Sequence, residues 1–341
     1  MDRTIDDDIA AFVIAEFTEA LDDFFARRGD AKAIASRAAT GAAVERDRWT
    51  ALCGIGLTAL RVGEPRGLGA NLRAATAVAE KLGAVLVPEP ASTTIIVAHA
   101  LDRYGGPTDL RDSIVDGSRI VSCSDFTPVT LTTANAVIGH VEVADDELCD
   151  LVAVLADSAL VIVERSALRA GAERCGVDPT RPTVRCDLDG TPAVTALRLP
   201  AVAMTGIADE LKLMLASELA GGMGAVLEET IGYVRERKQF GRIIGGFQAV
   251  KHTLADLYAN TEQASAAVQF AAISCDQGRD SASADVAAAA RWVTRAAIDT
   301  FDRALHLHGA MGYSWELDVH LQLRRALSIH QMLSRQWDFV A

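Results

Sequence analysis

The stretch Arg235-Glu236-Arg237-Lys238-Gln239-Phe240-Gly241, followed by Phe247-Gln248, decides how this chain is interpreted. It separates two long segments with apolar residues at helical spacing, one beginning near Ile207 and the other running to about Asp276. A guanidinium offers phosphate oxygens a planar fork of donors, and a neighbouring aromatic ring can cover a flat ligand. The pattern favours a site for a diphosphate joined to a flat ring. A solvated basic helix end that complements the helix dipole is the alternative.

The segment from Gly246 to Asp276 shows the clearest helical pattern. Apolar and small residues recur there at alternating spacings of three and four, as in a helix packed nearly antiparallel to its neighbours. Segment 282–305 is rich in alanine, which lets helix backbones approach closely. Together with the segments before and after them, these predict a C-terminal four-helix bundle. The expected seam is Val250, Leu254, Leu257, Thr261, Ala264, Val268, Ala271 and Cys275.

The pattern divides the chain into three domains and predicts a mainly α fold with a small β-domain. Residues 1–114 are expected to form an N-terminal helical domain, residues 115–203 a reduced middle β-domain, and residues 204–341 the bundle. In the first domain, helices are expected at 5–28, 43–53, 70–83 and 91–104. In the second, turn residues such as Asp189-Gly190 separate six short β-rich runs. These are Arg119–Cys123, Ala136–Val143, Leu151–Leu155, Leu160–Glu164, Thr183–Asp187 and Val194–Leu199.

Composition limits the class of function. The chain has 341 residues, 50% of them hydrophobic, and a formal net charge of −13. A net acidic chain is a poor nucleic-acid binder, because phosphate contacts supply most of that affinity. The acidic start Met1–Asp8 has the wrong charge for a signal peptide, and no apolar run is long enough to span a membrane. Six scattered cysteines without metal-ligand spacing indicate buried thiols in a reducing cytoplasm.

No metal site is expected either. His306 and His308 are two residues apart on a predicted helix, so their side chains point to different sides. No His-Glu-x-x-His or similar cluster occurs in the sequence.

Together with His306-Leu307-His308-Gly309-Ala310-Met311-Gly312-Tyr313-Ser314-Trp315-Glu316, the bundle segments resemble the acyl-CoA dehydrogenase family. The resemblance extends over about residues 5–335 and implies a helical, β, helical domain order. It also implies that the Arg-x-Gln-Phe-Gly segment reaches across a subunit interface to the adenosine diphosphate part of a neighbour's FAD. The Gly-x-x-Gly-Tyr segment would lie against the same cofactor. The implied cofactor-binding residues are Arg237, Gln239, Phe240, Ile244, Phe247, Gln248, His306, Gly309 and Ala310.

The resemblance leaves this chain without an evident catalytic base. The family carries a glutamate at one of two positions, which fall here on Leu333 and Leu211. Glu210 is adjacent to the second position, but one residue along a helix turns a side chain by about 100°. Glu210 is therefore a weak candidate, and a solvated first-turn glutamate is the alternative. His330 is interpreted as a surface histidine, and Glu316 as a residue that caps or ion-pairs at a helix start.

The β-domain also departs from the family pattern. The region that should lead to a Gly-Ser-Asp contact with flavin and acyl-CoA reads Ser122-Cys123-Ser124-Asp125-Phe126-Thr127-Pro128, and no Gly-Ser-Asp follows. The tryptophan-containing strand that lies against the flavin ring in the family is missing, because no tryptophan occurs between Trp49 and Trp292. The half-site offered to a neighbour is thus retained, and the half-site for the chain's own flavin is eroded.

These losses predict one subunit of a heteromeric acyl-CoA dehydrogenase. The chain resembles the shorter subunit of actinobacterial enzymes that act on steroid side-chain CoA esters. It would complete the FAD site of a paralogous partner in an α2β2 assembly, with electron-transfer flavoprotein as acceptor. Two alternatives remain open: a scaffold subunit that does not touch FAD, and a self-sufficient homo-oligomeric flavoenzyme using Glu210.

Overall fold

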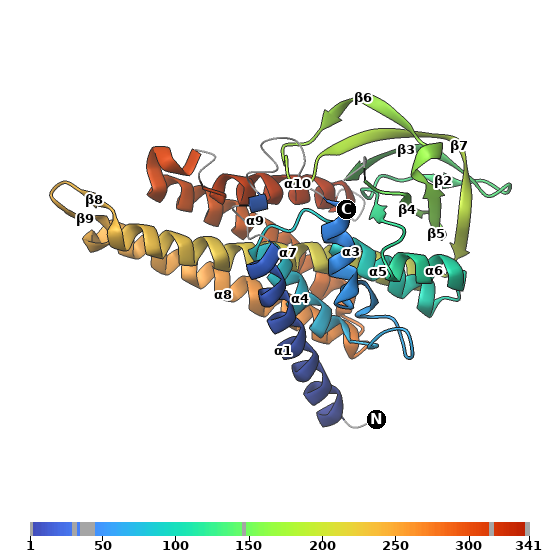
Figure 1. Ribbon diagram of the computed structural model, residues 1–341, viewed down its shortest axis with the longest axis horizontal. Coiled ribbons are helices and arrows are strands. Elements are labelled where there is room, and N and C mark those ends of the chain that lie inside the picture. The colour runs from blue at the N-terminus through green and yellow to red at the C-terminus, as the bar shows by residue number, and fades with distance from the viewer. Residues whose placement is uncertain (1–2, 29–32, 35–44, 145–147, 314–316, 338–341) are drawn as a thin grey trace.

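Four long helices form the C-terminal part of the computed structural model, which describes residues 3–28, 33–34, 45–144, 148–313 and 317–337 (Figure 1). Helix α7 packs along both α8 and α9, and α10 packs against α9. All eight expected seam positions on α8 are buried or half-buried, so the predicted bundle is confirmed. The helices are α7 (Ala201–Glu236), α8 (Gln248–Asp276), α9 (Ala282–His308) and α10 (Val319–Trp337).

The N-terminal part is helical, as predicted. It contains α1 (Arg3–Arg28), α3 (Arg46–Gly54), α4 (Leu72–Ala84), α5 (Ala91–Arg103) and α6 (Thr108–Val115). The helix expected from residue 43 begins at Arg46 in the described chain, and α6 was not predicted. Single 3-10 turns occur at Leu57–Ala59, Arg165–Ala167, Ile244–Gly246 and Gly309–Tyr313.

The start of α4 is fixed from two directions. The Asn71 side chain accepts a hydrogen bond from the Ala74 amide at 2.9 Å, as expected of a helix N-cap. The carboxylate of Asp276, the last residue of α8, accepts the amides of Leu72 and Arg73 at 2.8 and 2.9 Å. One end of the bundle therefore satisfies amides that the first turn of α4 leaves without a helical partner.

Helices α4 and α7 cross at two glycines. A Cβ atom at Gly83 would lie 1.8 Å from the Glu218 carbonyl oxygen, and one at Gly221 would lie 1.8 Å from the Glu80 carbonyl oxygen. Only glycine allows backbones to approach this closely. The crossing sets the position of Glu218, a residue of the ionic cluster described below.

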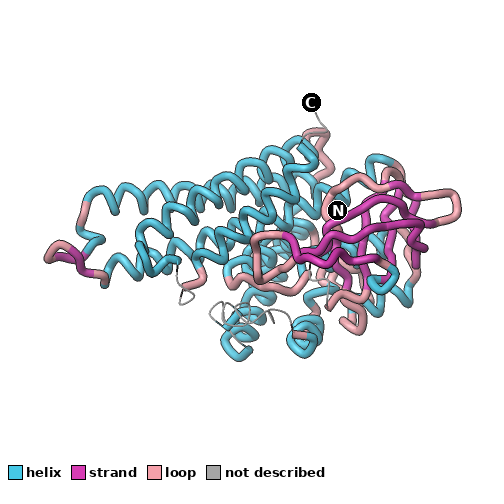
Figure 2. The backbone as a smooth tube through the Cα atoms, turned by 90° about the horizontal axis from the view of Figure 1, so that it is seen from above, coloured by secondary structure: helices cyan, strands magenta, loops and turns pink. Residues whose placement is uncertain are grey.

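The β-domain is a seven-stranded sheet at one end of the bundle (Figure 2). The strand order is β1-β4-β5-β7-β3-β2, with β6 also paired to β7. Among the strands of this sheet that the structure describes, only the β1–β4 pair is parallel. The strands are β1 (Val121–Cys123), β2 (Thr130–Leu131), β3 (Ala136–Ala144), β4 (Leu151–Ala156), β5 (Ala159–Glu164), β6 (Arg169–Cys175) and β7 (Thr183–Arg198).

The prediction of two strands separated by a turn at Asp189-Gly190 is wrong. One strand, β7, runs through this stretch, and β3 pairs with it at Val137–Thr191 and Ile138–Asp189. Gly190, with φ +68°, is thus an extra residue in β7, which is a β-bulge rather than a turn. The short β2 and the strand β6 were also missed. The predicted boundary at residue 203 falls inside α7, which begins at Ala201.

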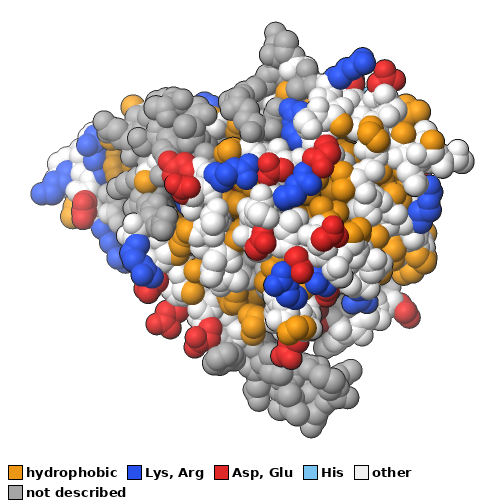
Figure 3. Space-filling model, turned by 45° about the vertical axis from the view of Figure 1, so that its right-hand side comes forward, with side chains coloured by type: hydrophobic (Ala, Val, Ile, Leu, Met, Phe, Trp, Pro, Cys, Tyr) orange, Lys and Arg blue, Asp and Glu red, His pale blue; other side chains and the backbone are white. Residues whose placement is uncertain are grey.

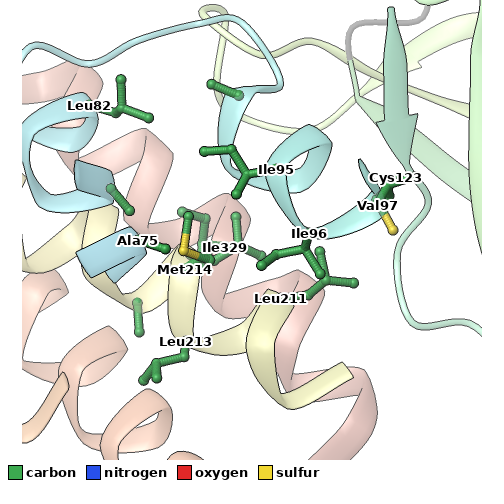
Figure 4. Close-up of a cluster of buried hydrophobic side chains, with 14 of the residues drawn as sticks. Ala75, Leu82, Ile95, Ile96, Val97, Cys123, Leu211, Leu213, Met214 and Ile329 are labelled. Carbon is green, nitrogen blue, oxygen red and sulfur yellow. The ribbon is translucent and has the colours of Figure 1, made fainter. Parts of the chain in front are cut away.

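One hydrophobic core runs through all three parts of the chain. Ile96 of α5, Leu211 of α7 and Ile329 of α10 belong to it, and Figure 4 shows these side chains among their neighbours. On the face in Figure 3, acidic and basic side chains lie interspersed, with no single basic patch. None of the helices that the structure describes is both long and apolar enough to cross a membrane.

Candidate functional site

The residues between α7 and α8, which include Lys238-Gln239-Phe240-Gly241, form a protruding hairpin at the end of the bundle far from the sheet (Figure 1). Its strands are β8 (Lys238–Gln239) and β9 (Arg242–Ile243). The turn residues Phe240 and Gly241 have φ of +54° and +76°, as a two-residue hairpin turn with matched twist requires. The Ile244 amide closes the hairpin by donating to the Arg237 carbonyl at 2.9 Å.

The hairpin displays charge and aromatic surface together. Phe240 is 92% exposed, and Arg237 is also exposed. The Arg242 guanidinium lies 3.8 Å from the Phe247 ring centroid, and Phe247 meets Phe240 edge to face at 6.2 Å. Phe247 is thus covered by a cation, whereas Phe240 presents its ring to solvent. An aromatic residue held at positive φ and almost fully exposed is a costly arrangement that indicates function.

The second predicted cofactor segment lies at the same end of the bundle. The rings of Tyr233 on α7 and His308 on α9 are 4.4 Å apart, and the Tyr233 hydroxyl donates to the His308 carbonyl at 3.3 Å. Gly309 and Ala310, which follow, are exposed. Tyr233 is one helical turn before Arg237, so the structure brings both predicted segments together. The linking role of Tyr233 was missed, and its only sequence signal is that spacing.

The two histidines of this segment point apart, as predicted. His308 is buried beside Thr230, with 3.1 Å between His308 Nε2 and Thr230 Oγ1. Burial lowers the pKa of His308, so the neutral ring is favoured. His306 is exposed, and its Nδ1 lies 2.8 Å from the Asp302 carbonyl oxygen. Only His306 is available to a molecule bound at the surface.

A separate cavity lies between the end of β1 and helix α10, the regions to which the resemblance assigns the flavin-ring contact and one of the two base positions. It is lined on one side by Ser122, Cys123 and Asp125, and on another by Ile329 and Met332 of α10. Its volume is about 70 Å³, far below the roughly 300–1,000 Å³ of ordinary ligand sites. The residues present do not fit a flavin ring there.

Three charged side chains, those of Asp178, Arg181 and Arg325, line one wall of this cavity, and the buried Glu218 pairs with both arginines. The Arg181 guanidinium donates to Glu218 at 2.7 Å, and Glu218 also accepts the Ser92 hydroxyl at 2.6 Å. Arg325 donates to Asp178 and, at 3.4 Å, to Glu218. We call Asp178, Arg181, Glu218 and Arg325 the ionic cluster.

Asp178 is ionised in this cluster. Burial alone would raise the pKa of its carboxyl group, but the charge of Arg325 and hydrogen bonds from Thr180 and Arg325 outweigh burial. The pKa of Asp178 is therefore held below its ordinary value.

Neither predicted base position offers a carboxylate. Leu211 is 2% exposed and Leu333 1% exposed, and both belong to the core. Glu210, the weak candidate, forms an ion pair with Arg61 at 2.7 Å. Glu210 lines neither the small cavity nor the larger hollow described next. The arrangement gives Glu210 a structural partner rather than a place beside a substrate.

His330 is not the surface residue that was predicted. It is half-buried on α10, and burial together with Arg295 lowers the pKa of its ring. Glu316, predicted to cap or ion-pair at a helix start, lies outside the described residues.

A larger, open hollow of about 660 Å³ lies between the β4–β5 turn and the first turns of α7 and α9. Apolar residues dominate its lining, with Lys212, Arg291 and Asp157 as its charged members. Lys212 is already paired with Asp209 at 2.8 Å. Among the described residues, no group of three or more His, Cys, Asp or Glu side chains could hold a metal ion.

Comparison with known proteins defines the class first. The acyl-CoA dehydrogenase C-terminal domain family matches residues 201–331, which include α7, the hairpin, α8, α9 and most of α10. Acyl-CoA dehydrogenase IpdE2 of Mycobacterium tuberculosis is 32% identical over 308 residues, covering 88% of both chains. The chain therefore belongs to the acyl-CoA dehydrogenase family.

Solved structures show the same fold over nearly the whole chain. The Tcur3481-Tcur3483 steroid ACAD has a TM-score of 0.78 at 23% identity and covers 96% of this chain and 98% of its own. The ChsE4-ChsE5 complex from Mycobacterium tuberculosis has a TM-score of 0.77 at 21% identity, with 99% and 97% covered. The helical, β, helical architecture predicted from the sequence is confirmed.

Proposed function

We propose that this chain is one subunit of a heteromeric, FAD-dependent acyl-CoA dehydrogenase and completes the FAD site of a catalytic partner. The carrying observation is the contrast between the two half-sites. The hairpin exposes Arg237 and Phe240 for a ligand outside this chain. The chain's own cavity is about 70 Å³ and has buried leucines at both base positions.

Each hairpin residue has a role in binding. The Arg237 guanidinium would donate to diphosphate oxygens, and Phe240 would cover a flat ring of the cofactor. Arg242 keeps Phe247 covered and the turn in place, while Gln239, Ile244 and Gln248 complete the rim. At the adjoining end of α9, the exposed His306, Gly309 and Ala310 would lie against the same cofactor.

The bound FAD would accept a hydride from the acyl-CoA substrate, which is the chemistry of α,β-desaturation. No residue of this chain is assigned to proton abstraction, because Glu210 is paired with Arg61. This chain's contribution is to hold the cofactor and exclude water from its diphosphate end. The base and the acyl pocket would belong to the partner.

The comparisons support the type of partner and substrate. One solved structure with this fold is the Tcur3481-Tcur3483 steroid ACAD, whose name joins two proteins. Another is the complex of ChsE4 with ChsE5. A paralogous partner in an α2β2 assembly agrees with these descriptions, and a steroid side-chain CoA ester is the substrate we propose. Electron-transfer flavoprotein is the acceptor and the cytoplasm the location that we propose with it.

The test is flavin content per chain, measured by absorbance after purification alone and after co-expression with a paralogous dehydrogenase. We expect a colourless chain alone and one FAD per pair of chains together. Arg237→Ala removes at least one charge-assisted hydrogen bond worth about 1.5–3 kcal/mol, so FAD should bind at least roughly 10- to 150-fold more weakly. Arg185→Ala, which removes the same charge from the exposed face of β7, is the matched control.

The alternatives predict other results. A scaffold subunit would leave flavin content unchanged in Arg237→Ala. A self-sufficient enzyme would carry one FAD per chain when purified alone and would lose activity in Glu210→Gln. Either result would refute the shared site.

A further inference from the structure

The ionic cluster joins four segments that are distant in the sequence. Asp178 and Arg181 lie in the connection from β6 to β7, Glu218 lies on α7, and Arg325 lies on α10. The fourth segment is the turn before α5, where the Val87 carbonyl accepts hydrogen bonds from Arg181 at 2.7 Å and Arg325 at 3.2 Å. The cluster therefore ties the β-domain to helices of both other parts of the chain.

The cluster is buried and electrically balanced. The side chains of Asp178, Glu218 and Arg325 are 1%, 1% and 3% exposed, and that of Arg181 is 11% exposed. Two arginines and two carboxylates sum to zero formal charge, and each carboxylate has a hydroxyl donor besides its arginine: Thr180 or Ser92. A buried set of charges is tolerated when each is paired and hydrogen-bonded in this way.

The ionic cluster also lies at the small cavity. Asp178, Arg181 and Arg325 line the 70 Å³ cavity between the sheet and the helices. The cluster therefore fills space in a chain that also lacks the family's flavin-ring contacts.

We propose that the ionic cluster replaces the flavin ring in this chain: it closes the chain's own ring site and clasps the β-domain to the helices without a cofactor. This inference deepens the proposed function, on which it rests, because it explains why a pair of chains would hold one FAD. The folded state of this subunit then needs no flavin, and its own site binds none.

The first experiment needs no variant. Lumiflavin, the flavin ring without its diphosphate and adenosine, is titrated into the full-length wild-type chain, and quenching of its fluorescence reports binding. We expect no saturable binding at millimolar lumiflavin and no change in the unfolding midpoint. Saturable binding at one lumiflavin per chain would overturn the closed site.

The second experiment tests the clasp by charge balance. Arg325→Met leaves an unbalanced buried negative charge and should lower the unfolding midpoint by roughly 5–10 °C. Adding Asp178→Asn restores neutrality and should recover at least half of that loss. Arg324→Met, at the exposed neighbouring residue, should change the midpoint by no more than about 2 °C.

Two results would refute the proposal that the ionic cluster holds the β-domain to the helices. One is an Arg325→Met midpoint equal to that of Arg324→Met. The other is a double variant that is no more stable than the single one, because a packing defect alone would not be repaired by neutralising Asp178. If Arg325→Met does not fold, rescue by Asp178→Asn still decides the question. None of these readouts depends on Arg237, whose FAD test decides the proposed function separately.

Discussion

Gly221→Ala should destabilise this protein more than almost any other single-methyl change on α7. The added Cβ would lie 1.8 Å from the Glu80 carbonyl oxygen and 2.5 Å from its carbon. Because a methyl carbon rests about 3.3 Å or more from such an oxygen, α4 and α7 would have to separate by roughly 1.5 Å. Both clashing groups are backbone, so no rotamer change can relieve them. Overpacking usually costs about 1–3 kcal/mol, and we expect about 3 kcal/mol or more, or roughly 6–12 °C in midpoint.

Gly232→Ala is the matched control for this change. Gly232 is exposed on the same helix, and its added Cβ would meet no atom within 4 Å. Alanine should therefore stabilise the helix there by about 0.5–1 kcal/mol. Urea unfolding followed by far-ultraviolet circular dichroism measures both variants. A Gly221→Ala protein at least as stable as wild type would refute the close crossing and the register it gives Glu218.

Three further predictions concern other parts of the molecule. Burial, then the charge of Arg61, lowers the pKa of His99 from 6.5 to about 4. The free energy of unfolding that neutral His99 contributes is complete above pH 6.5 and is lost as the pH falls towards the folded pKa. Between pH 7 and pH 4, the free energy of unfolding of wild type should therefore fall by about 3 kcal/mol more than that of His99→Asn, as measured by urea unfolding. Burial raises the pKa of Glu80, which has hydroxyl and amide donors in Ser265 and Gln269. The stability it gives is complete at low pH and is lost as pH rises through its folded pKa, so Glu80→Gln should raise the midpoint at pH 8 and not at pH 4. Phe240→Ser should leave the midpoint within about 2 °C but reduce FAD retained by the complex during gel filtration, because the exposed ring contributes to binding and not to the core.

The helical bundle could be predicted because each helix has a periodic apolar face. The α8 seam was read correctly from spacings of three and four, which depend only on the helix itself. The long strand β7 could not be predicted, because the sequence Asp189-Gly190 is compatible with both a turn and a β-bulge. Pairing with β3 decides between them, and that contact joins residues about fifty positions apart in the sequence. Local signals do not contain this information.

The candidate site shows the same division. Arg237 and Phe240 could be singled out as candidates because a basic and aromatic stretch between two helices is visible in the sequence. The ionic cluster was missed, because Asp178, Arg181, Glu218 and Arg325 come from three separate segments and none is unusual alone.

The exposed hairpin and the filled cavity together support the proposal that this subunit works with a partner. Phe240 keeps an aromatic ring in water and a backbone at positive φ, and both cost free energy in an isolated chain. Its ring meets the half-buried ring of Phe247 edge to face, and its own ring remains 92% exposed. Inside the chain the opposite holds, because every member of the ionic cluster is paired. An interior paired without a flavin, beside an exposed aromatic residue at positive φ, supports our proposal that the contacts of Phe240 are made with another molecule.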